Sequence, residues 1–266
     1  MRYVWHVIVL VLCATCVVAC APDWQSAQPS LLAAQLAKAD NAAAQRRLFY
    51  VGIALWPEQW SENDVVDLAE TLRTSSSFEV VPMIASNYFA DGPIAYPIAD
   101  DAAIANLIAT AASRAGPDDL VFVHISTHGG PGLLARKIED GPQSTLGAAG
   151  LARLLAPLGK HRTVIVVSAC YSGSLIASLR GPDRIIMTAA RADRSSFGCQ
   201  ASSRHTFFGD AELRGFDTRD RSLHQAFIVI SDDVAAMEQE RHYRPPSQPQ
   251  VWVGAGVQDL YEAPLF

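Results

Sequence analysis

The sequence has little of what would assign it to a membrane, nucleic-acid-binding or repeat class. Only one uncharged, largely apolar run is long, from Tyr3 to Ala19, which excludes a multi-span membrane protein. Positive charge is not in excess: 21 Lys and Arg oppose 27 Asp and Glu, and the net charge of −6 gives no support for a nucleic-acid partner. We find no repeat at a fixed period. With 266 residues, 50% of them hydrophobic, we expect one domain with one sizeable core.

Several signatures of enzyme chemistry are also missing. The chain has no G-x-S-x-G serine elbow, no phosphate-binding P-loop and no G-x-G-x-x-G dinucleotide motif. His124 and His128 are four residues apart, but they form no H-E-x-x-H pattern and no carboxylates cluster around them, so a zinc site is disfavoured. We therefore expect no cofactor and no metal.

The amino-terminal segment has the order of an export signal. Arg2 precedes the uncharged run, and a polar stretch follows it. Val17-Val18-Ala19-Cys20 resembles a bacterial lipobox, in which the cysteine becomes the lipidated first residue, whereas Ala19-Cys20-Ala21 also fits an ordinary A-x-A cleavage site and plain secretion. We predict a signal peptide over residues 1–19 and a lipid anchor on Cys20. The protein is then expected on the periplasmic side of the bacterial cell envelope, anchored to the outer membrane.

The chain has five cysteines, and few of them remain for the folded body. Cys13 and Cys16 leave with the signal and Cys20 is expected to be modified, so only Cys170 and Cys199 are left. Two cysteines do not make a disulfide framework. Cys199 could be a second nucleophile, a disulfide partner or a packed core residue, and we favour the core.

From residue 48 onward, strand-like and helix-like segments alternate. Near-continuous apolar strands in such an order predict an α/β fold with a mostly parallel sheet of about six strands and helices on both faces. Residues 20–47 are expected to be a tether with a short helix, 48–256 the folded domain and 257–266 a tail. Strands are predicted at 48–55, 78–84, 120–126, 163–168, 184–189 and 250–253, and helices at 61–72, 100–115, 150–158, 172–179 and 222–240.

Two of the predicted strands end in residues that look reactive. His128, followed by Gly129, comes just after 120–126, and Cys170 comes just after 163–168. In parallel α/β sheets the site lies beyond the carboxyl ends of the strands. A thiolate is the attacking species, and a nearby imidazole or helix N-terminus lowers its pKa. Glycine lets backbone amides converge on one point, as a tetrahedral oxyanion requires. The pattern therefore favours nucleophilic catalysis by a cysteine and a histidine.

These residues resemble the caspase-like clan of cysteine peptidases, and within it the bacterial branch of the legumain-type (asparaginyl endopeptidase) family. His128 precedes Cys170 by 170 − 128 = 42 residues, near the roughly 50 of the caspase signature. The family motif E-A-C-x-S-G-S is matched with Ser168 in place of the glutamate. The resemblance covers about residues 48–256 and implies a caspase-like fold. Its motifs lie at 168–174, 188–190, 195–199 and 206–210.

The resemblance implies a role for each matching residue. Cys170 corresponds to the nucleophile and His128 to the general base and acid, while the backbone N–H groups of Gly129 and Cys170 correspond to the oxyanion hole. Asp210 matches an aspartate of the pocket for the residue before the scissile bond, and Ser168 replaces a pocket glutamate. That replacement removes a charged acceptor from the pocket. We therefore expect the strict preference for asparagine before the scissile bond to be relaxed, so that Arg and Lys are accepted as well as Asn.

Two family features have no assigned counterpart in this chain. Where the family has a pocket arginine after its first strand, this chain has Trp60 and Ser61. The group that orients the catalytic histidine is likewise unassigned. We therefore expect an exported cysteine endopeptidase acting on a peptide or protein by acyl transfer. The alternatives are a transpeptidase that uses the same dyad and a catalytically silent, caspase-fold periplasmic binding protein.

Overall fold

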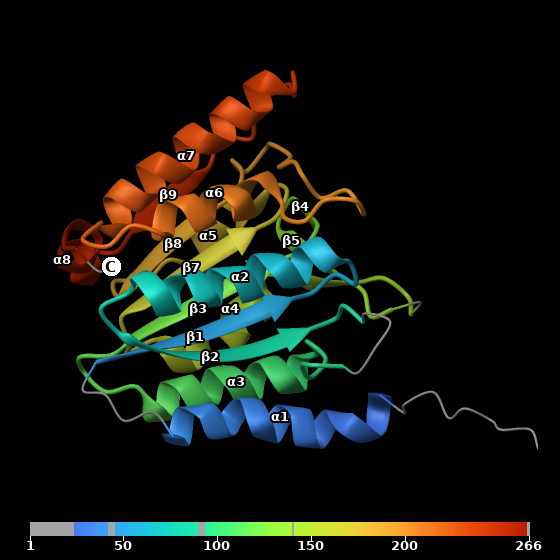
Figure 1. The fold of residues 1–266 in the computed structure, drawn as a ribbon, viewed down its shortest axis with the longest axis vertical. Coiled ribbons are helices and arrows are strands. Elements are labelled where there is room, and N and C mark those ends of the chain that lie inside the picture. Colours follow the sequence, from blue (N-terminus) through green and yellow to red (C-terminus); the bar gives the residue numbers. More distant parts are fainter. Residues whose placement is uncertain (1–23, 42–45, 90–93, 140, 265–266) are drawn as a thin grey trace, which may run out of the picture.

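Six strands of the chain pair into one central sheet (Figure 1), in the order β2-β1-β3-β7-β8-β9. The computed structural model describes residues 24–41, 46–89, 94–139 and 141–264. Five strands are parallel and β9 runs antiparallel to β8, so the predicted mostly parallel sheet is confirmed. The strands are β1 (Arg47–Ala54), β2 (Glu79–Ser86), β3 (Leu120–Ser126), β7 (Thr163–Ser168), β8 (Arg184–Thr188) and β9 (Gln250–Val253).

The central strands are buried on both of their faces, as expected for strands that lie inside the sheet. Every residue of β3 (LVFVHIS) and of β7 (TVIVVS) is buried. β-branched residues make up five of the six positions of β7 and three of the seven of β3, and such side chains pack well on a pleated surface. The strand bounds predicted from the sequence agree with the structure to within two residues.

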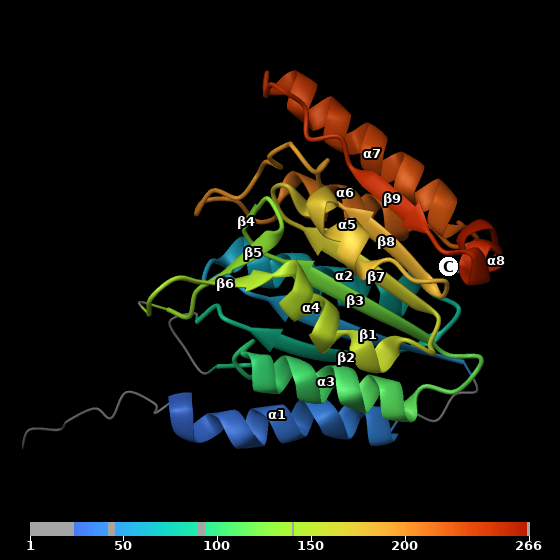
Figure 2. The same cartoon turned by 180° about the vertical axis from the view of Figure 1, so that it is seen from behind.

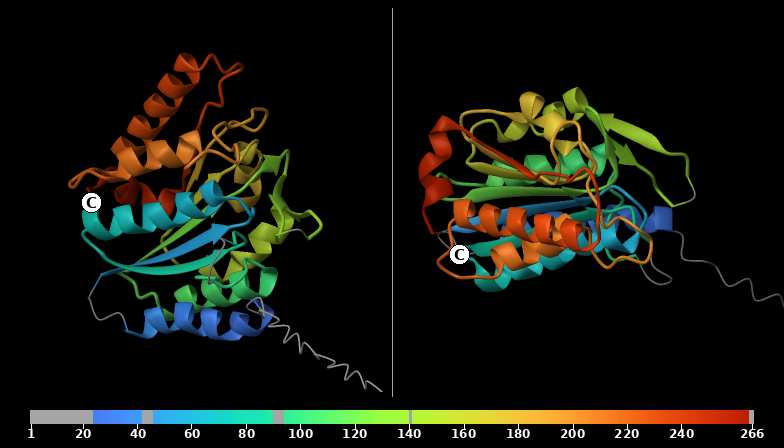
Figure 3. Two further views of the ribbon diagram at one scale, coloured as in Figure 1. Left: turned by 45° about the vertical axis from the view of Figure 1, so that its right-hand side comes forward. Right: turned by 90° about the horizontal axis from the view of Figure 1, so that it is seen from above.

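Helices cover both faces of the sheet (Figures 1 and 2). The face that carries α2, α6 and α7 is opposite the face that carries α1, α3, α4 and α5, and the view from above in Figure 3 separates these layers. The helices are α1 (Trp24–Asn41), α2 (Gln59–Ser75), α3 (Asp101–Arg114), α4 (Ala148–Leu154), α5 (Ile176–Leu179), α6 (Phe207–Phe216), α7 (Leu223–Glu240) and α8 (Gln258–Glu262). Single 3-10 turns lie at Ala156–Leu158, Ser172–Leu175 and Ala255–Val257.

Two local predictions are wrong in the same way, since both misjudge where a helix begins. The segment 61–64 does not cap α2, because the helix already begins at Gln59, and Ser61 and Asp64 are buried inside it. Behind Cys170 the chain forms a 3-10 turn first, and α5 is only four residues long. The predicted helix dipole behind the cysteine is therefore weak at best.

A second, small sheet lies against the carboxyl end of β3. Its strands are β4 (Gly129–Gly130), β5 (Leu133–Arg136) and β6 (Ser144–Gly147), antiparallel and in that order. The sequence analysis predicts none of the three. Because β4 starts directly after His128, this sheet fixes the course of the chain that leaves the histidine.

The amino-terminal helix α1 packs against α3 and the edge strand β2. Gln35 Oε1 accepts a hydrogen bond from the Ile84 N–H at 3.1 Å, and Gln28 Oε1 accepts one from the Ile98 N–H at 2.6 Å. The predicted signal peptide 1–19 and Cys20 lie outside the described residues. None of the helices within 24–264 that the structure describes has the length and apolar character needed to cross a membrane.

Candidate active site

The predicted reactive residues leave the sheet side by side. β3 and β7 are hydrogen-bonded neighbours, with Ser126 paired to Ser168 at their carboxyl ends. His128 and Cys170 each follow these paired serines by two residues. The expectation that both loops open on the same edge is confirmed by this register.

The two loops are in direct contact. A Cβ atom on Gly129 would overlap the carbonyl oxygen of Cys170, so this close approach requires glycine. A second link joins them where the Gly132 N–H donates to Ser174 Oγ at 2.8 Å. Tyr171 adopts a left-handed conformation with φ of 58°, and this sharp turn directly follows the cysteine. The loops therefore form one rigid unit around Cys170.

The Cys170 thiol is half-buried and lies against the backbone of Ser196. The Ser196 N–H donates to Sγ at 3.3 Å, and the Ser196 hydroxyl lies 3.6 Å from the same sulfur. The thiol in turn lies 3.5 Å from the Ser196 carbonyl oxygen, so the backbone of Ser196 fixes the position of the sulfur. Within the described ranges, no acceptor bonds the Cys170 backbone N–H, so this amide is free for a ligand.

His128 lies between two indole rings. The ring centroids of Trp56 and Trp60 are 4.6 Å and 5.1 Å from the imidazole centroid, and both contacts are edge-on. Burial lowers the pKa of His128, and the nearby Glu58 carboxylate opposes that effect without cancelling it. Since the neutral imidazole is the form that accepts a proton, this environment suits a general base at neutral pH.

Glu58 connects the two indole rings. Its carboxylate accepts a hydrogen bond from Trp56 Nε1 at 3.3 Å and one from Trp60 Nε1 at 2.6 Å. It therefore holds both rings that flank His128 and also influences the charge of the imidazole. The sequence analysis missed this role, although two tryptophans on either side of a glutamate directly after β1 were a visible signal.

Asp64 of α2 is buried beneath the site and was also missed. Its Oδ2 accepts hydrogen bonds from Ser126 Oγ and Thr206 Oγ1, both at 2.8 Å, and Ser168 Oγ lies 3.4 Å away. Burial raises the pKa of this carboxyl, while His124 and these hydrogen bonds oppose the rise. One carboxylate thus joins the ends of β3 and β7 to the start of α6.

The two predicted pocket residues, Ser168 and Asp210, make separate contacts. The Ser168 hydroxyl is buried and bonded to Thr206 Oγ1 at 3.0 Å. Asp210 lies in the first turn of α6 with 43% of its side chain exposed, and its carboxylate lies 3.0 Å from His205 Nδ1. The other ring nitrogen of His205 contacts Asp67 at 2.9 Å. Burial lowers the pKa of His205, but these two carboxylates outweigh it and leave the pKa raised.

Cys199 is a free, half-buried thiol near the site. Burial, followed by the nearby Cys170, raises the pKa of the Cys199 thiol to about 11. It therefore stays protonated at neutral pH and is a poor nucleophile. Cys199 belongs to neither apolar core, so the favoured core role is not confirmed. In the part of the chain that the structure describes, no group of three or more His, Cys, Asp or Glu side chains could hold a metal ion.

Solved structures of known proteins share the fold. Caspase-1 from Spodoptera frugiperda matches with a TM-score of 0.53 and 16% sequence identity, over 79% of this chain and 86% of that one. The structure of pro-sf-caspase-1 matches with a TM-score of 0.52 and 15% identity, over 80% of this chain and 92% of that one. The fold is therefore caspase-like.

Sequence relatives carry the comparison further. Hemoglobinase from Schistosoma japonicum is 40% identical over 90 residues, which are 32% of this chain and 20% of that protein. Human legumain is 33% identical over 105 residues, which are 36% of this chain and 23% of legumain. The matched segments thus span less than a quarter of these relatives. The Peptidase C13 family model matches residues 102–259, a stretch that includes both His128 and Cys170. The chain belongs to the peptidase C13 family, the legumain-type cysteine peptidases.

Proposed function

We propose that the protein is a cysteine endopeptidase that acts by acyl transfer. The contact between the His128 and Cys170 loops, made through Gly129, is the observation that carries the proposal. His128 takes the proton of the Cys170 thiol, and the resulting thiolate attacks the peptide carbonyl. The tetrahedral intermediate collapses as the C–N bond breaks and His128 donates that proton to the leaving amine. His128 then takes a proton from water, which attacks the thioester and releases the acid and the thiolate.

The backbone N–H groups of Gly129 and Cys170 are proposed to bind the oxyanion. Both belong to the touching loops, and the Cys170 amide has no other partner among residues 24–41, 46–89, 94–139 and 141–264. Removing one such donor from an acyl-transfer enzyme costs on the order of 10²–10³ in kcat. The two amides do not reorganise during the reaction, because the second sheet and the β7 end hold them in place.

For the residue before the scissile bond, we propose a preference relaxed to Asn, Arg and Lys, with Asp210 and Ser168 as pocket residues. Ser168 stands where the family motif has a glutamate, which leaves Asp210 as the charged member. Asp210 already contacts His205, whose pKa is raised, so a protonated His205 competes with a basic substrate side chain. The preference for Arg or Lys over Asn should therefore grow as the pH rises and His205 loses its proton.

The proposal also includes export and a lipid anchor on Cys20, which rest on the sequence of residues 1–20. Replacing Cys20 with Ser should move the protein from the detergent phase to the soluble fraction. A variant that stays in the membrane with residues 1–19 attached would instead show an uncleaved anchor. A soluble wild-type protein that begins at Pro22 would support plain secretion.

Hydrolysis of a peptide library by the chain without residues 1–20 tests the endopeptidase directly. We expect cleavage by the wild type, none by Cys170→Ala, and a loss on the order of 10²–10⁴ in rate for His128→Ala. Retained activity in Cys170→Ala would contradict the proposal. A folded wild type that cleaves nothing would favour the silent binding protein, and capture of the acyl group by an added amine in preference to water would favour the transpeptidase.

A further inference from the structure

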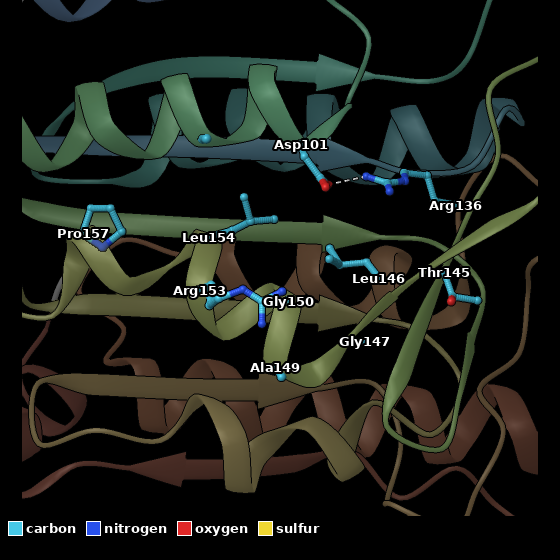
Figure 4. Close-up of a pocket in the computed structure, with 11 residues that line it drawn as sticks. Asp101, Arg136, Thr145, Leu146, Gly147, Ala149, Gly150, Arg153, Leu154 and Pro157 are labelled. Carbon is cyan, nitrogen blue, oxygen red and sulfur yellow. Dashed lines mark hydrogen bonds and ion pairs between the residues drawn. The ribbon is translucent and has the colours of Figure 1, made fainter.

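A pocket lined by both apolar and charged side chains lies two strands away from the catalytic histidine. It has a volume of about 550 Å³ and is formed by α3, α4, β5 and β6. Figure 4 shows Arg153 on α4 and the Arg136–Asp101 pair on the other side, with Leu146 and Leu154 between them. None of the catalytic residues lines this pocket, so it is distinct from the site described above.

The pocket carries one cation without a partner. Arg153 is exposed, and its guanidinium forms no hydrogen bond or ion pair with any residue that the structure describes. Arg136 is mostly buried, with 18% of its side chain exposed, and its guanidinium is held by Asp101 and by Ser144. Two arginines against one aspartate leave a local positive charge on a chain whose net charge is −6. A carboxylate is the complementary ligand, because guanidinium pairs with it in two-point geometry.

The small sheet gives the separation between this pocket and the active site. Gly130 pairs with Leu133, and Leu133 pairs with Gly147, which lines the pocket. Neighbouring strands lie about 4.8 Å apart, so Gly147 is about 10 Å from Gly130, which is two residues after His128. An extended peptide advances about 3.3 Å per residue, so about three residues bridge this gap.

The chemistry fixes which half of a substrate lies on this side. His128 protonates the leaving amine, so the residues after the scissile bond lie next to His128 and continue toward β4. The acyl half stays with Cys170. A chain running from His128 across the small sheet would bring its third to fifth residues after the scissile bond to the pocket.

We propose that this pocket binds acidic side chains of the substrate, at the third to fifth residues after the scissile bond. The proposal rests on the proposed endopeptidase activity and adds a substrate class to it. Arg153 makes the direct ion pair with the substrate carboxylate, and Arg136 contributes charge that Asp101 partly cancels. The two arginines thus select for acidic segments that follow the cleavage point.

Two labelled peptides test the proposal. They share one sequence with Asn before the scissile bond, and they differ only in carrying Asp-Glu-Asp or Asn-Gln-Asn at the third to fifth residues after it. Binding is measured by fluorescence anisotropy with Cys170→Ala, and kcat/KM is measured with the chain that retains Cys170. We expect the acidic peptide to bind about two- to fivefold more tightly, as for a solvent-accessible ion pair. The preference should fade in 0.5 M salt.

Three substitutions sharpen the result. Arg153→Gln should remove the preference, whereas Asp101→Asn should increase it because Arg136 is then unpaired. Arg180→Gln is the matched control: Arg180 is also exposed and its guanidinium has no partner in the described residues, but it lies outside the pocket. Equal binding of the two peptides, or an equal loss of preference with Arg180→Gln, would overturn the inference. Cleavage of both peptides would still support the proposed function. If the acidic peptide bound more tightly but the wild-type chain cleaved neither peptide, the pocket would be supported and the proposed function contradicted.

Discussion

The two faces of the central strands carry different kinds of side chain. On β1 and β3, Tyr50 and His124 point toward α2 and α6, whereas the alternate residues Val51 and Val123 pack beneath α3. Tyr50 OH lies 2.9 Å from His124 Nδ1, and His124 Nε2 lies 3.3 Å from the buried carboxylate of Glu212. One face is thus an apolar layer, and the other contains a buried polar network.

The difference shows which face organises the site. Buried polar groups cost free energy unless they are paired, so a fold gains nothing from them as packing material. Here they lie where the ends of β3 and β7 must meet α2 and α6, and Asp64 makes that connection. We infer that the apolar cores of both faces supply stability and that the α2 face, through its buried polar groups, also positions the reactive loops.

We expect the largest effect when one substitution on each face of the sheet is compared. Asp64→Asn replaces an acceptor with an amide that also carries donors, and these would face the hydroxyls of Ser126 and Thr206. We expect kcat/KM to fall on the order of 10², because small displacements of reacting groups carry costs of that size. Val123→Ala removes apolar volume and should lower the free energy of unfolding by about 2 kcal/mol.

Kinetics at a temperature well below both melting transitions separates these two outcomes. Val123→Ala should keep its kcat/KM within about twofold of wild type, since only stability is lost. A loss of kcat/KM in Val123→Ala as large as that in Asp64→Asn would show that the two faces do not differ in function.

A smaller effect is expected at Glu58. Glu58→Gln removes the charge that raises the pKa of His128 against the effect of burial, so the pKa of His128 should fall further. The acidic limb of the pH profile of kcat/KM should then move to lower pH. The rate at neutral pH should drop about tenfold as the two indole rings lose their common acceptor. An unmoved acidic limb would show that Glu58 supports only the tryptophans.

The smallest effect concerns His205, which links α2 to α6 through Asp67 and Asp210. Because its pKa is raised in the folded state, its contribution to stability is present below its ordinary pKa and is lost as the pH rises through the folded value. Denaturant titrations of His205→Gln should show a deficit of about 1 kcal/mol at acidic pH that shrinks at alkaline pH. The control is His224→Gln, a half-exposed histidine that contacts Glu262 and stacks on Tyr261. A deficit independent of pH would contradict the charged bridge.

The sheet and the two reactive residues could be predicted because their signals are local. An apolar run such as 163–168 is enough to predict a strand and its ends. Cys170 follows this run directly, so its place at the end of the strand could be predicted too. Asp64 could not be assigned, because its partners depend on how α2 lies against β3 and α6. Glu58 contacts two tryptophans that are its near neighbours in sequence, and only its proximity to His128 depends on the tertiary fold. A polar run that starts with Ser61 is a good capping signal in isolation, and only the tertiary contacts show that Asp64 is buried.

The central claim is that Cys170 and His128 act together, and covalent labelling tests it most directly. The chain without residues 1–20 would be treated with a peptidyl acyloxymethyl ketone, followed by intact mass measurement and peptide mapping. The account predicts a single adduct on Cys170, no adduct in Cys170→Ala, and labelling of His128→Ala slowed on the order of 10²–10⁴. An adduct on Cys199, or a folded wild-type chain that stays unlabelled, would contradict it.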